Sequence, residues 1–177
     1  MAQDPAGDTR PGQQEAVRLR PPRQRVSGRA IPYWAVRALL GWLALALVQV
    51  AWLVSAPAED PGAHVAGLVA TAVVAAAHVL VMPQWRYRVH RWEATSQAVY
   101  TQSGWFHQER RIAPVSRIQT VDSERGPFEQ LFGLANVTVT TASAAGPLRI
   151  RGLDQATAQR LLDELTASTQ ASRDDAT

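Results

Sequence analysis

Two long apolar stretches near the start of the chain constrain its fold more than any other feature of the sequence. After Arg37 the first stretch continues to Ala56 without a formal charge, and the second covers residues 63–82, also without one. Each is long enough to cross about 30 Å of hydrocarbon at a helical rise of about 1.5 Å per residue. Only the short segment 57–62 separates them, so the sequence predicts two antiparallel transmembrane helices.

Two other kinds of protein would also contain such stretches. A soluble protein can bury an apolar helix, but both stretches are apolar around their full circumference and lack a polar face of helical period. A cleaved signal peptide would end near Ala56-Pro57-Ala58, but this apolar stretch is too long and follows a long polar segment. We therefore predict a hairpin over residues 32–83, with spans at about 34–56 and 63–82.

The distribution of arginine predicts the orientation of this hairpin. The arginines that flank the spans are Arg18, Arg20, Arg23, Arg25 and Arg29 before the first and Arg86, Arg88 and Arg91 after the second. The connection contains Glu59 and Asp60 but no Arg. By the positive-inside rule, we expect a multi-pass protein of the cell membrane with both termini in the cytoplasm. Trp34, Trp85 and Tyr87 are predicted as interfacial anchors, because Trp and Tyr concentrate at both membrane surfaces.

Four polar side chains, Gln49, His64, Thr71 and His78, lie inside the predicted spans. Ionisable residues within a membrane can mark a transport path. The pattern favours packing instead, because Gln49 can bridge to the partner helix and small residues at 66–75 permit close approach.

Composition excludes several classes of chemistry. The chain has no cysteine, which excludes disulfides, thiolate catalysis and cysteine-ligated metals. Its net charge of +3 gives no reason to expect nucleic-acid binding. The sequence has no His-x-x-x-His spacing, no Gly-x-Ser-x-Gly elbow and no Gly-rich phosphate loop. We therefore predict a protein that is not an enzyme, with no catalytic residues, metal site or cofactor.

Outside the hairpin, the pattern predicts two polar tails and a small folded domain. Residues 1–31, rich in Arg, Pro and Gln, are predicted to be a disordered cytoplasmic tail, as are residues 169–177. Between residues 84 and 168, strand-like segments begin at 86–92, and a turn at Ser103-Gly104 joins 97–102 to 105–112. Further segments follow at 118–121, 136–141 and 148–150.

The soluble part ends in a predicted amphipathic helix. Asp154 is a candidate N-cap, and Ala158, Leu161, Leu162 and Leu165 share one helical face. The fold class is therefore α+β: a transmembrane hairpin followed by a small bent sheet or partly open barrel, capped by a C-terminal helix.

Three segments of this domain resemble a known family. They are residues 114–121, with Arg-Ile-Gln-Thr-Val, residues 125–128, and residues 131–143, with Phe-Gly-Leu-Ala. Together with the hairpin, they resemble the YdbS-like family of bacterial pleckstrin-homology-like membrane proteins. The residues that carry the motif are Arg117, Ile118, Gln119, Val121, Pro127, Phe132, Gly133 and Leu134. One departure is Glu129-Gln130, where the family pattern has a polar-basic pair.

The motif itself favours a structural role. Arg117 and Gln119 would stay polar on a strand whose Ile118 and Val121 face inward. Phe128 and Leu131 would then form, with Phe132, an apolar helical turn that plugs the sheet.

The resemblance implies a pleckstrin-homology-like fold and a function at the cell envelope. Family members are similar to proteins that act in envelope stress or as interaction modules. We therefore expect a membrane-anchored interaction or assembly module, with the bilayer and a protein as partners. That protein would be a larger multi-domain relative or another copy of this chain. One alternative is a sensor of lipid headgroups that uses Arg86, Arg88, Arg91, Arg110 and Arg111. Another is an accessory subunit of a transporter.

Overall fold

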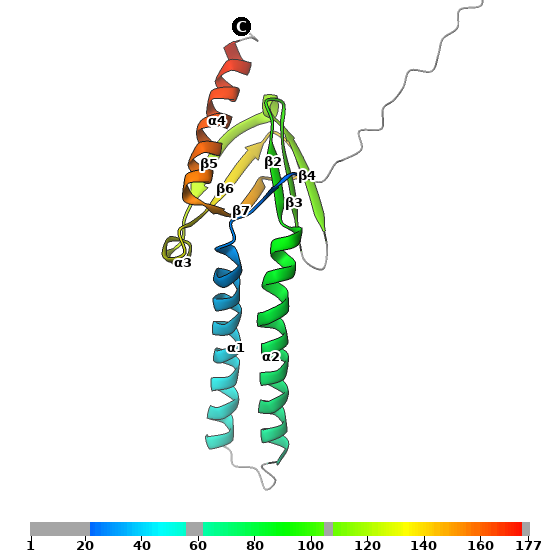
Figure 1. Cartoon of the computed structure of the whole chain (residues 1–177), viewed down its shortest axis with the longest axis vertical. Coiled ribbons are helices and arrows are strands. Elements are labelled where there is room, and N and C mark those ends of the chain that lie inside the picture. Colours follow the sequence, from blue (N-terminus) through cyan, green and yellow to red (C-terminus); the bar gives the residue numbers. More distant parts are fainter. Residues whose placement is uncertain (1–21, 56–61, 105–107, 175–177) are drawn as a thin grey trace, which may run out of the picture.

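The structure is a computed structural model, and it describes residues 22–55, 62–104 and 108–174. Two long helices, α1 (Ala30–Ser55) and α2 (Gly62–Val89), lie side by side below a domain of strands and short helices (Figure 1). The connection predicted between them lies outside the described residues.

The exposure of α1 and α2 supports membrane spans. None of the most apolar part of either helix is buried inside the protein, which argues against core helices of a soluble protein. The first turn of α1 belongs to the core of the domain, which argues against a cleaved signal peptide. The predicted bridge between the helices is confirmed, because Gln49 Nε2 donates a hydrogen bond of 2.9 Å to Thr71 Oγ1.

Helix α2 is longer than predicted. It continues through Pro83 to Val89, and strand β2 (Arg91–Ala94) begins almost immediately after it. The prediction of a strand from residue 86 is therefore wrong. Pro83 and Val89 are buried, and Tyr87 packs against the core. The alternating polarity of residues 86–92 also fits a strand, but these contacts with the domain stabilise the helix as far as Val89.

Within the described residues, seven strands form two antiparallel sheets that do not close into a barrel. The first sheet has the order β1-β2-β3-β4 and contains β1 (Gln24–Arg25), β2, β3 (Ala98–Ser103) and β4 (Glu109–Pro114). The second contains β5 (Ile118–Glu124), β6 (Leu134–Thr141) and β7 (Leu148–Asp154), in that order. A 3-10 turn (Val115–Arg117) precedes β5, and the short helix α3 (Pro127–Leu131) connects β5 to β6. The antiparallel β3–β4 pair confirms the predicted hairpin, whose residues 105–107 lie outside the described residues.

The N-terminal tail is ordered over residues 22–31, so the prediction of disorder is wrong there. Strand β1 pairs with β2, with Gln24 opposite Trp92, and Val26 is buried in the core. The Ser27 amide donates a hydrogen bond of 2.8 Å to the Gly152 carbonyl on β7. A polar segment with few apolar residues can order in this way because an existing sheet edge supplies its hydrogen-bond partners.

Helix α4 (Gln155–Asp174) lies across the sheets (Figure 1). Its cap is confirmed, since the Thr157 amide donates a hydrogen bond of 2.9 Å to Asp154 Oδ1. Burial raises the pKa of Asp154, but the hydrogen bonds from Thr157 outweigh it, and the net pKa lies below its ordinary value. The predicted stripe is confirmed as well, with Ala158, Leu161 and Leu165 buried. The helix continues to Asp174, so the disorder predicted from residue 169 is wrong over that part.

The short helix α3 lies outside the sheet instead of plugging it. Phe128 is 44% exposed and Leu131 is 78% exposed, while Phe132 packs against the core. The predicted apolar plug is therefore wrong for Phe128 and Leu131. Figure 1 shows the reason: α3 lies beside the start of α1, at the end of the domain nearest the helix pair.

Candidate functional site: a cleft where the helices meet the domain

The first turns of α1 join the domain through an aromatic contact. Tyr33 and Trp34 are 6% and 5% exposed and belong to the hydrophobic core. Gly152 on β7 lies against them at a positive φ of 77°, and a Cβ there would lie 3.1 Å from the Cβ of Ala30. The prediction of Trp34 as an interfacial anchor is therefore wrong, because protein surrounds its ring.

Three arginines stack on aromatic rings at this junction. Arg86 lies 4.5 Å from the centre of the Trp34 ring, and Arg25 lies 5.8 Å from that of Tyr87. Arg37 lies 5.8 Å from that of Tyr33. Cation–π contacts of this kind stabilise a junction by about 0.5–2 kcal/mol each. Tyr87 therefore contacts other residues of the protein, and its role as an anchor at the membrane interface stays a prediction. Trp85 is half exposed, and its role as an interfacial anchor stays a prediction.

A hydrogen-bond network links α1 to α3 and β6. The Tyr33 hydroxyl donates to Glu129 Oε1 at 2.6 Å, and it accepts a hydrogen bond of 2.9 Å from Arg37 Nη1. Asn136 Nδ2 donates to the same Glu129 oxygen at 3.4 Å. The hydrogen bond from Tyr33 holds the pKa of Glu129 below its ordinary value, so this carboxylate is ionised at neutral pH. The departure from the family motif at Glu129 thus has a structural explanation.

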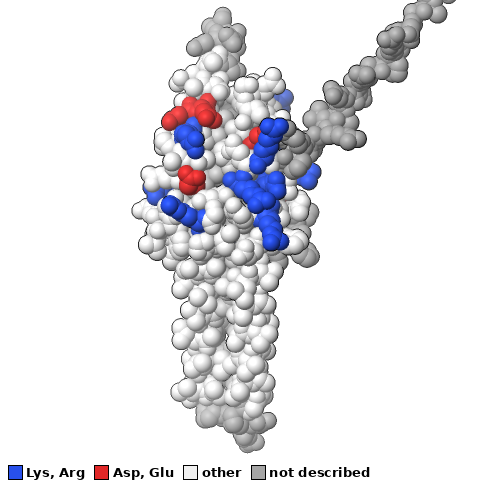
Figure 2. Space-filling view, viewed as in Figure 1, with Lys and Arg blue, Asp and Glu red and all other residues white. Residues whose placement is uncertain are grey.

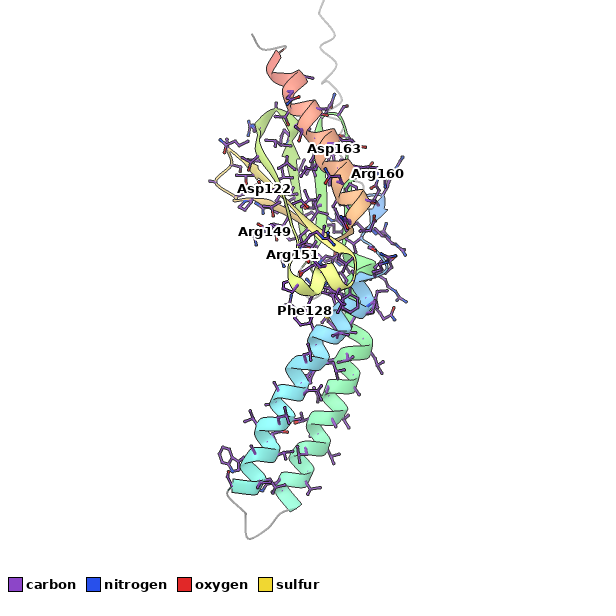
Figure 3. All side chains as sticks on the ribbon, turned by 90° about the vertical axis from the view of Figure 1, so that its left-hand side faces the viewer. Asp122, Phe128, Arg149, Arg151, Arg160 and Asp163 are labelled. Atoms are coloured by element: carbon purple, nitrogen blue, oxygen red, sulfur yellow. The ribbon has the colours of Figure 1, made fainter. Side chains whose placement is uncertain are left out.

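A cavity of about 450 Å³ lies between the end of α2 and the two sheets. Its lining residues are Arg86, His90, Thr101, Ser103, Gly104, Glu109, Arg111, Pro147, Arg149 and Arg151. We call the subset Arg86, Arg149 and Arg151, with His90, Thr101 and Ser103, the arginine cleft. Leu148 and Ile150 point into the core, so the alternation of β7 places Arg149 and Arg151 on its other face. In Figure 3 the two labelled arginines lie on one side of the domain, between Asp122 and Phe128.

A second cavity, of about 500 Å³, adjoins the first. Both are lined by Arg86 and Arg151, so they meet at these two side chains. The second cavity also reaches Ala38 of α1 and His78 and Met82 of α2. The two cavities together therefore lead from the sheets to the domain-proximal part of the helix pair.

Arg111 is already occupied by other contacts. Its guanidinium donates hydrogen bonds to the carbonyl oxygens of Pro147 at 2.6 Å and Gly146 at 2.9 Å, and also to that of Ala145. Its Nε lies 3.6 Å from Glu109 Oε1, which is the one acidic side chain that lines the first cavity. Arg111 therefore ties β4 to the turn between β6 and β7.

The three arginines of the cleft have no such partners. Across residues 22–55, 62–104 and 108–174, no acidic side chain forms an ion pair with Arg86, Arg149 or Arg151. The neighbouring His90 is buried, at 7% exposed, and it is uncharged at neutral pH. Burial lowers the pKa of His90 to about 4, and the positive charges of Arg86 and Arg151 act in the same direction. At neutral pH the cleft thus carries three positive charges and an uncharged imidazole.

The structure separates the arginines that the sequence grouped as headgroup contacts. Arg86 and Arg111 line the cleft cavity, whereas Arg88 and Arg110 are exposed and Arg91 is half exposed. A headgroup contact for the last three stays a prediction. Sequence reasoning missed Arg149, Arg151 and His90. The alternation of Leu148-Arg-Ile-Arg151 was a usable signal, because it places two arginines on one face of a strand.

The family-motif residues shape the fold and line neither of these two cavities. Ile118 is buried and Val121 packs against the core. The strand register is irregular between Ile118 and Thr120, which lets Ile118 and Val121 face the same side. Arg117 and Gln119 are exposed. Pro127 begins α3, and Phe132 packs edge-on against the Tyr33 ring. Gly133 turns the chain at a φ of 65°, and Leu134 after it is fully buried.

The chemistry of this site is that of anion binding. Across the described parts of the chain, no three His, Asp or Glu side chains are grouped so as to hold a metal ion. Guanidinium groups present several N–H donors in a planar fork that matches carboxylate and phosphate oxygens. The arrangement can therefore bind an oxyanion.

Comparisons with known proteins agree with the fold. The family model for the bacterial PH domain matches residues 31–169, a range that includes both long helices. The UPF0699 transmembrane protein YdbS of Bacillus subtilis (strain 168) is 33% identical over 97 residues, which cover 55% of this chain and 60% of that protein. The match thus spans less than two thirds of this relative. No solved structure matches the chain. The predicted YdbS-like resemblance is confirmed, and the chain belongs to the bacterial PH domain family.

Proposed function

We propose that this protein is a non-enzymatic, membrane-anchored binding module, with its PH-like domain at the cytoplasmic surface of a bacterial cell membrane. The observation that carries the proposal is the continuity of the membrane helices with the domain core. Tyr33 and Trp34 of α1 and Val89 of α2 are buried in the domain, and Pro83 of α2 is buried as well. The cleft is thereby kept beside the membrane, where a tethered ligand-binding site would act.

The orientation follows from charge. The described arginines that flank the helices at the domain end are Arg23, Arg25, Arg29, Arg86, Arg88 and Arg91. The other end of the hairpin has Glu59 and Asp60 in its sequence and no arginine. Positive flanks are retained in the cytoplasm, which supports a cytoplasmic domain.

The surface near the helices also supports contact with a membrane. In Figure 2 basic residues gather at the base of the domain, and the visible surface of the helix pair below them shows no charge. Helix α3 exposes Phe128 and Leu131 at this level (Figure 1). Apolar side chains next to a basic band are typical of surfaces that lie in the headgroup region.

Single cysteines test this placement, because the chain has none of its own. We expect a fluorophore on Leu131→Cys to be quenched by brominated lipids in vesicles. The same fluorophore on Asp163→Cys, an exposed position of α4, should not be quenched. In intact cells Asp163→Cys should react with a membrane-impermeant maleimide only after lysis. Labelling of Asp163→Cys before lysis would contradict a cytoplasmic domain, and equal quenching at both positions would contradict the placement of α3.

A second candidate function is assembly with a protein partner, either another copy of this chain or a larger relative. The open sheets favour it: among the described residues, β4 pairs only with β3 and β5 only with β6, so each leaves an edge free for a further strand. A proline at Thr120 on β5 should then abolish crosslinked dimers or complexes in mild detergent. Unchanged crosslinking would contradict assembly through that edge. The transporter-subunit alternative stays a prediction.

A further inference from the structure

The arginine cleft concentrates positive charge, and Glu109, the acidic side chain that lines the same cavity, pairs with Arg111. Arg86 on α2 and Arg149 and Arg151 on β7 line one cavity, and none of the three forms an ion pair within the described residues. Grouped cations repel one another, and partial burial strengthens this repulsion because less water screens it. A fold stabilised only by its own contacts would gain by placing an acid here, and among the described residues none pairs with these three arginines, so the arrangement favours an anionic ligand.

One donor of the cleft, Arg86, is held in place before any ligand arrives. Arg86 is half buried and lies 4.5 Å from the centre of the Trp34 ring, which restricts its guanidinium. Arg149 and Arg151 project from the same face of a regular strand. Donors that are already positioned lose less conformational entropy on binding an oxyanion than exposed, mobile side chains do.

The hydroxyl groups around the arginines can donate to the same kind of ligand, whereas the ring of neutral His90 has no free N–H to offer. His90 Nδ1 lies 2.8 Å from the Arg86 carbonyl oxygen, so the neutral ring carries its proton on Nδ1. The hydroxyl side chains Thr101 and Ser103 also line the cavity. At about 450 Å³ the cavity is large enough for a small phosphorylated group and is within the usual range for ligand sites.

We propose that Arg86, Arg149 and Arg151 form a binding site for a phosphate ester between the helix pair and the domain. This inference rests on the proposed function and names the ligand class of that binding module. The second cavity begins at Arg86 and Arg151 and reaches His78 and Met82, so the rest of the ester has a path toward the membrane. A lipid headgroup and a soluble phosphate ester share this chemistry.

The test uses the full chain in maltoside detergent and phosphate-free buffer. Four probes are added separately: glycerol 3-phosphate, phosphatidylglycerol, and the phosphate-free counterparts glycerol and diacylglycerol. Thermal unfolding and native mass spectrometry report binding. We expect phosphatidylglycerol, glycerol 3-phosphate or both to raise the unfolding temperature, while the phosphate-free probes have no effect. Stabilisation by the lipid alone identifies a headgroup as the source, and stabilisation by both identifies the phosphate ester itself.

Charge-matched variants assign the binding to the cleft. Arg149→Gln and Arg151→Gln remove exposed side chains that line it, and each should weaken probe binding about tenfold, as loss of a charge-assisted contact does. Arg117→Gln removes the same charge from an exposed position just before β5 that lines neither cavity, and it should bind as the wild type does. Without a probe, Arg149→Gln and Arg151→Gln should unfold no earlier than the wild type, because they relieve repulsion.

Three results would overturn the inference. They are no binding of either phosphate probe, equal stabilisation by diacylglycerol, and a loss in Arg117→Gln as large as that in Arg151→Gln. The last would assign the effect to diffuse surface charge. These results are separable from failure of the proposed function. Cysteine labelling and lipid quenching report where the domain lies, whatever the cleft binds.

Discussion

The two ends of the described helix pair are held together by different kinds of contact. At the domain end, Trp34 and Tyr33 are buried among residues from β6, β7 and α2, and arginines stack on both rings. Further into the membrane span, two side-chain hydrogen bonds join the helices: Gln49 to Thr71, and Trp42 Nε1 to His78 Nδ1 at 2.9 Å. Most of the other apolar side chains of that part are exposed, while Leu53, Leu68 and Val79 are half buried.

This difference indicates which part of the protein contributes most to its stability. Burial of aromatic area in a close-packed core contributes several kcal/mol per side chain. Contacts between membrane helices contribute less, because lipid removes the hydrophobic driving force between them and an interhelical hydrogen bond averages only about 0.6 kcal/mol. The domain end should therefore control the stability of the whole molecule, while the membrane end should tolerate change.

The largest effect is expected from Trp34→Ala. Removing this ring leaves a cavity beside Arg86 and Gly152, and the substitution should lower the free energy of unfolding by about 3–5 kcal/mol. Hydrogen exchange of β6 amides in nanodiscs measures it. Trp52→Ala is the matched control, since its side chain is 64% exposed in the membrane span and should change the value by less than about 0.5 kcal/mol. Equal losses in the two variants would break the comparison.

Acidification should weaken the domain end through His90. Its pKa is about 4 in the folded protein, below the ordinary value of 6.5, so the unfolded chain binds a proton first as the pH falls. Stability is thus fully present above pH 6.5, and a loss on the order of 3 kcal/mol accumulates between pH 6.5 and 4. Urea unfolding at several pH values, in buffers without phosphate, measures this slope. His90→Gln should flatten it, and an unchanged slope in that variant would assign the effect to other groups.

The next effect tests the close approach of α1 to β7. Gly152→Ala places a Cβ at a positive φ and 3.1 Å from the Cβ of Ala30, so it should destabilise the domain by about 1–3 kcal/mol. Gly28→Ala is the control, because a Cβ there meets nothing within 4 Å. Thermal unfolding compares the two variants. If they melt together, the contact between the first turn of α1 and β7 is looser than the structure indicates.

The same comparison shows what could be predicted from the sequence. Local signals were sufficient for the membrane end, because hydropathy, length and the absence of charge in residues 38–56 depend on no distant contact. Asp154 and the apolar stripe of α4 were predictable for the same reason. The Ser103-Gly104 hairpin and the family motif were recognised from short runs of residues.

The domain end could not be predicted in this way. Val26 lies in a polar segment, and it is ordered by pairing with a strand that follows both membrane helices in the chain. Trp34 lies where an interfacial residue would lie, and the contacts that cover it come from Arg86 and Gly152, far along the chain. The arginine cleft likewise joins Arg86 to Arg151 from separate elements. Such contacts depend on tertiary structure, which single-sequence patterns do not encode.

The smallest effect is expected in the membrane span, from Gln49→Leu. The variant loses the hydrogen bond to Thr71, which contributes about 0.6 kcal/mol in a typical membrane helix pair. It also removes a buried amide oxygen that has no hydrogen-bond partner among the described residues, and this gain offsets part of the loss. A double-mutant cycle with Thr71→Val in nanodiscs isolates the pairwise energy. We expect a coupling below about 1 kcal/mol. A coupling as large as the loss in Trp34→Ala would show that one contact of the membrane end contributes as much to stability as a buried ring of the domain end.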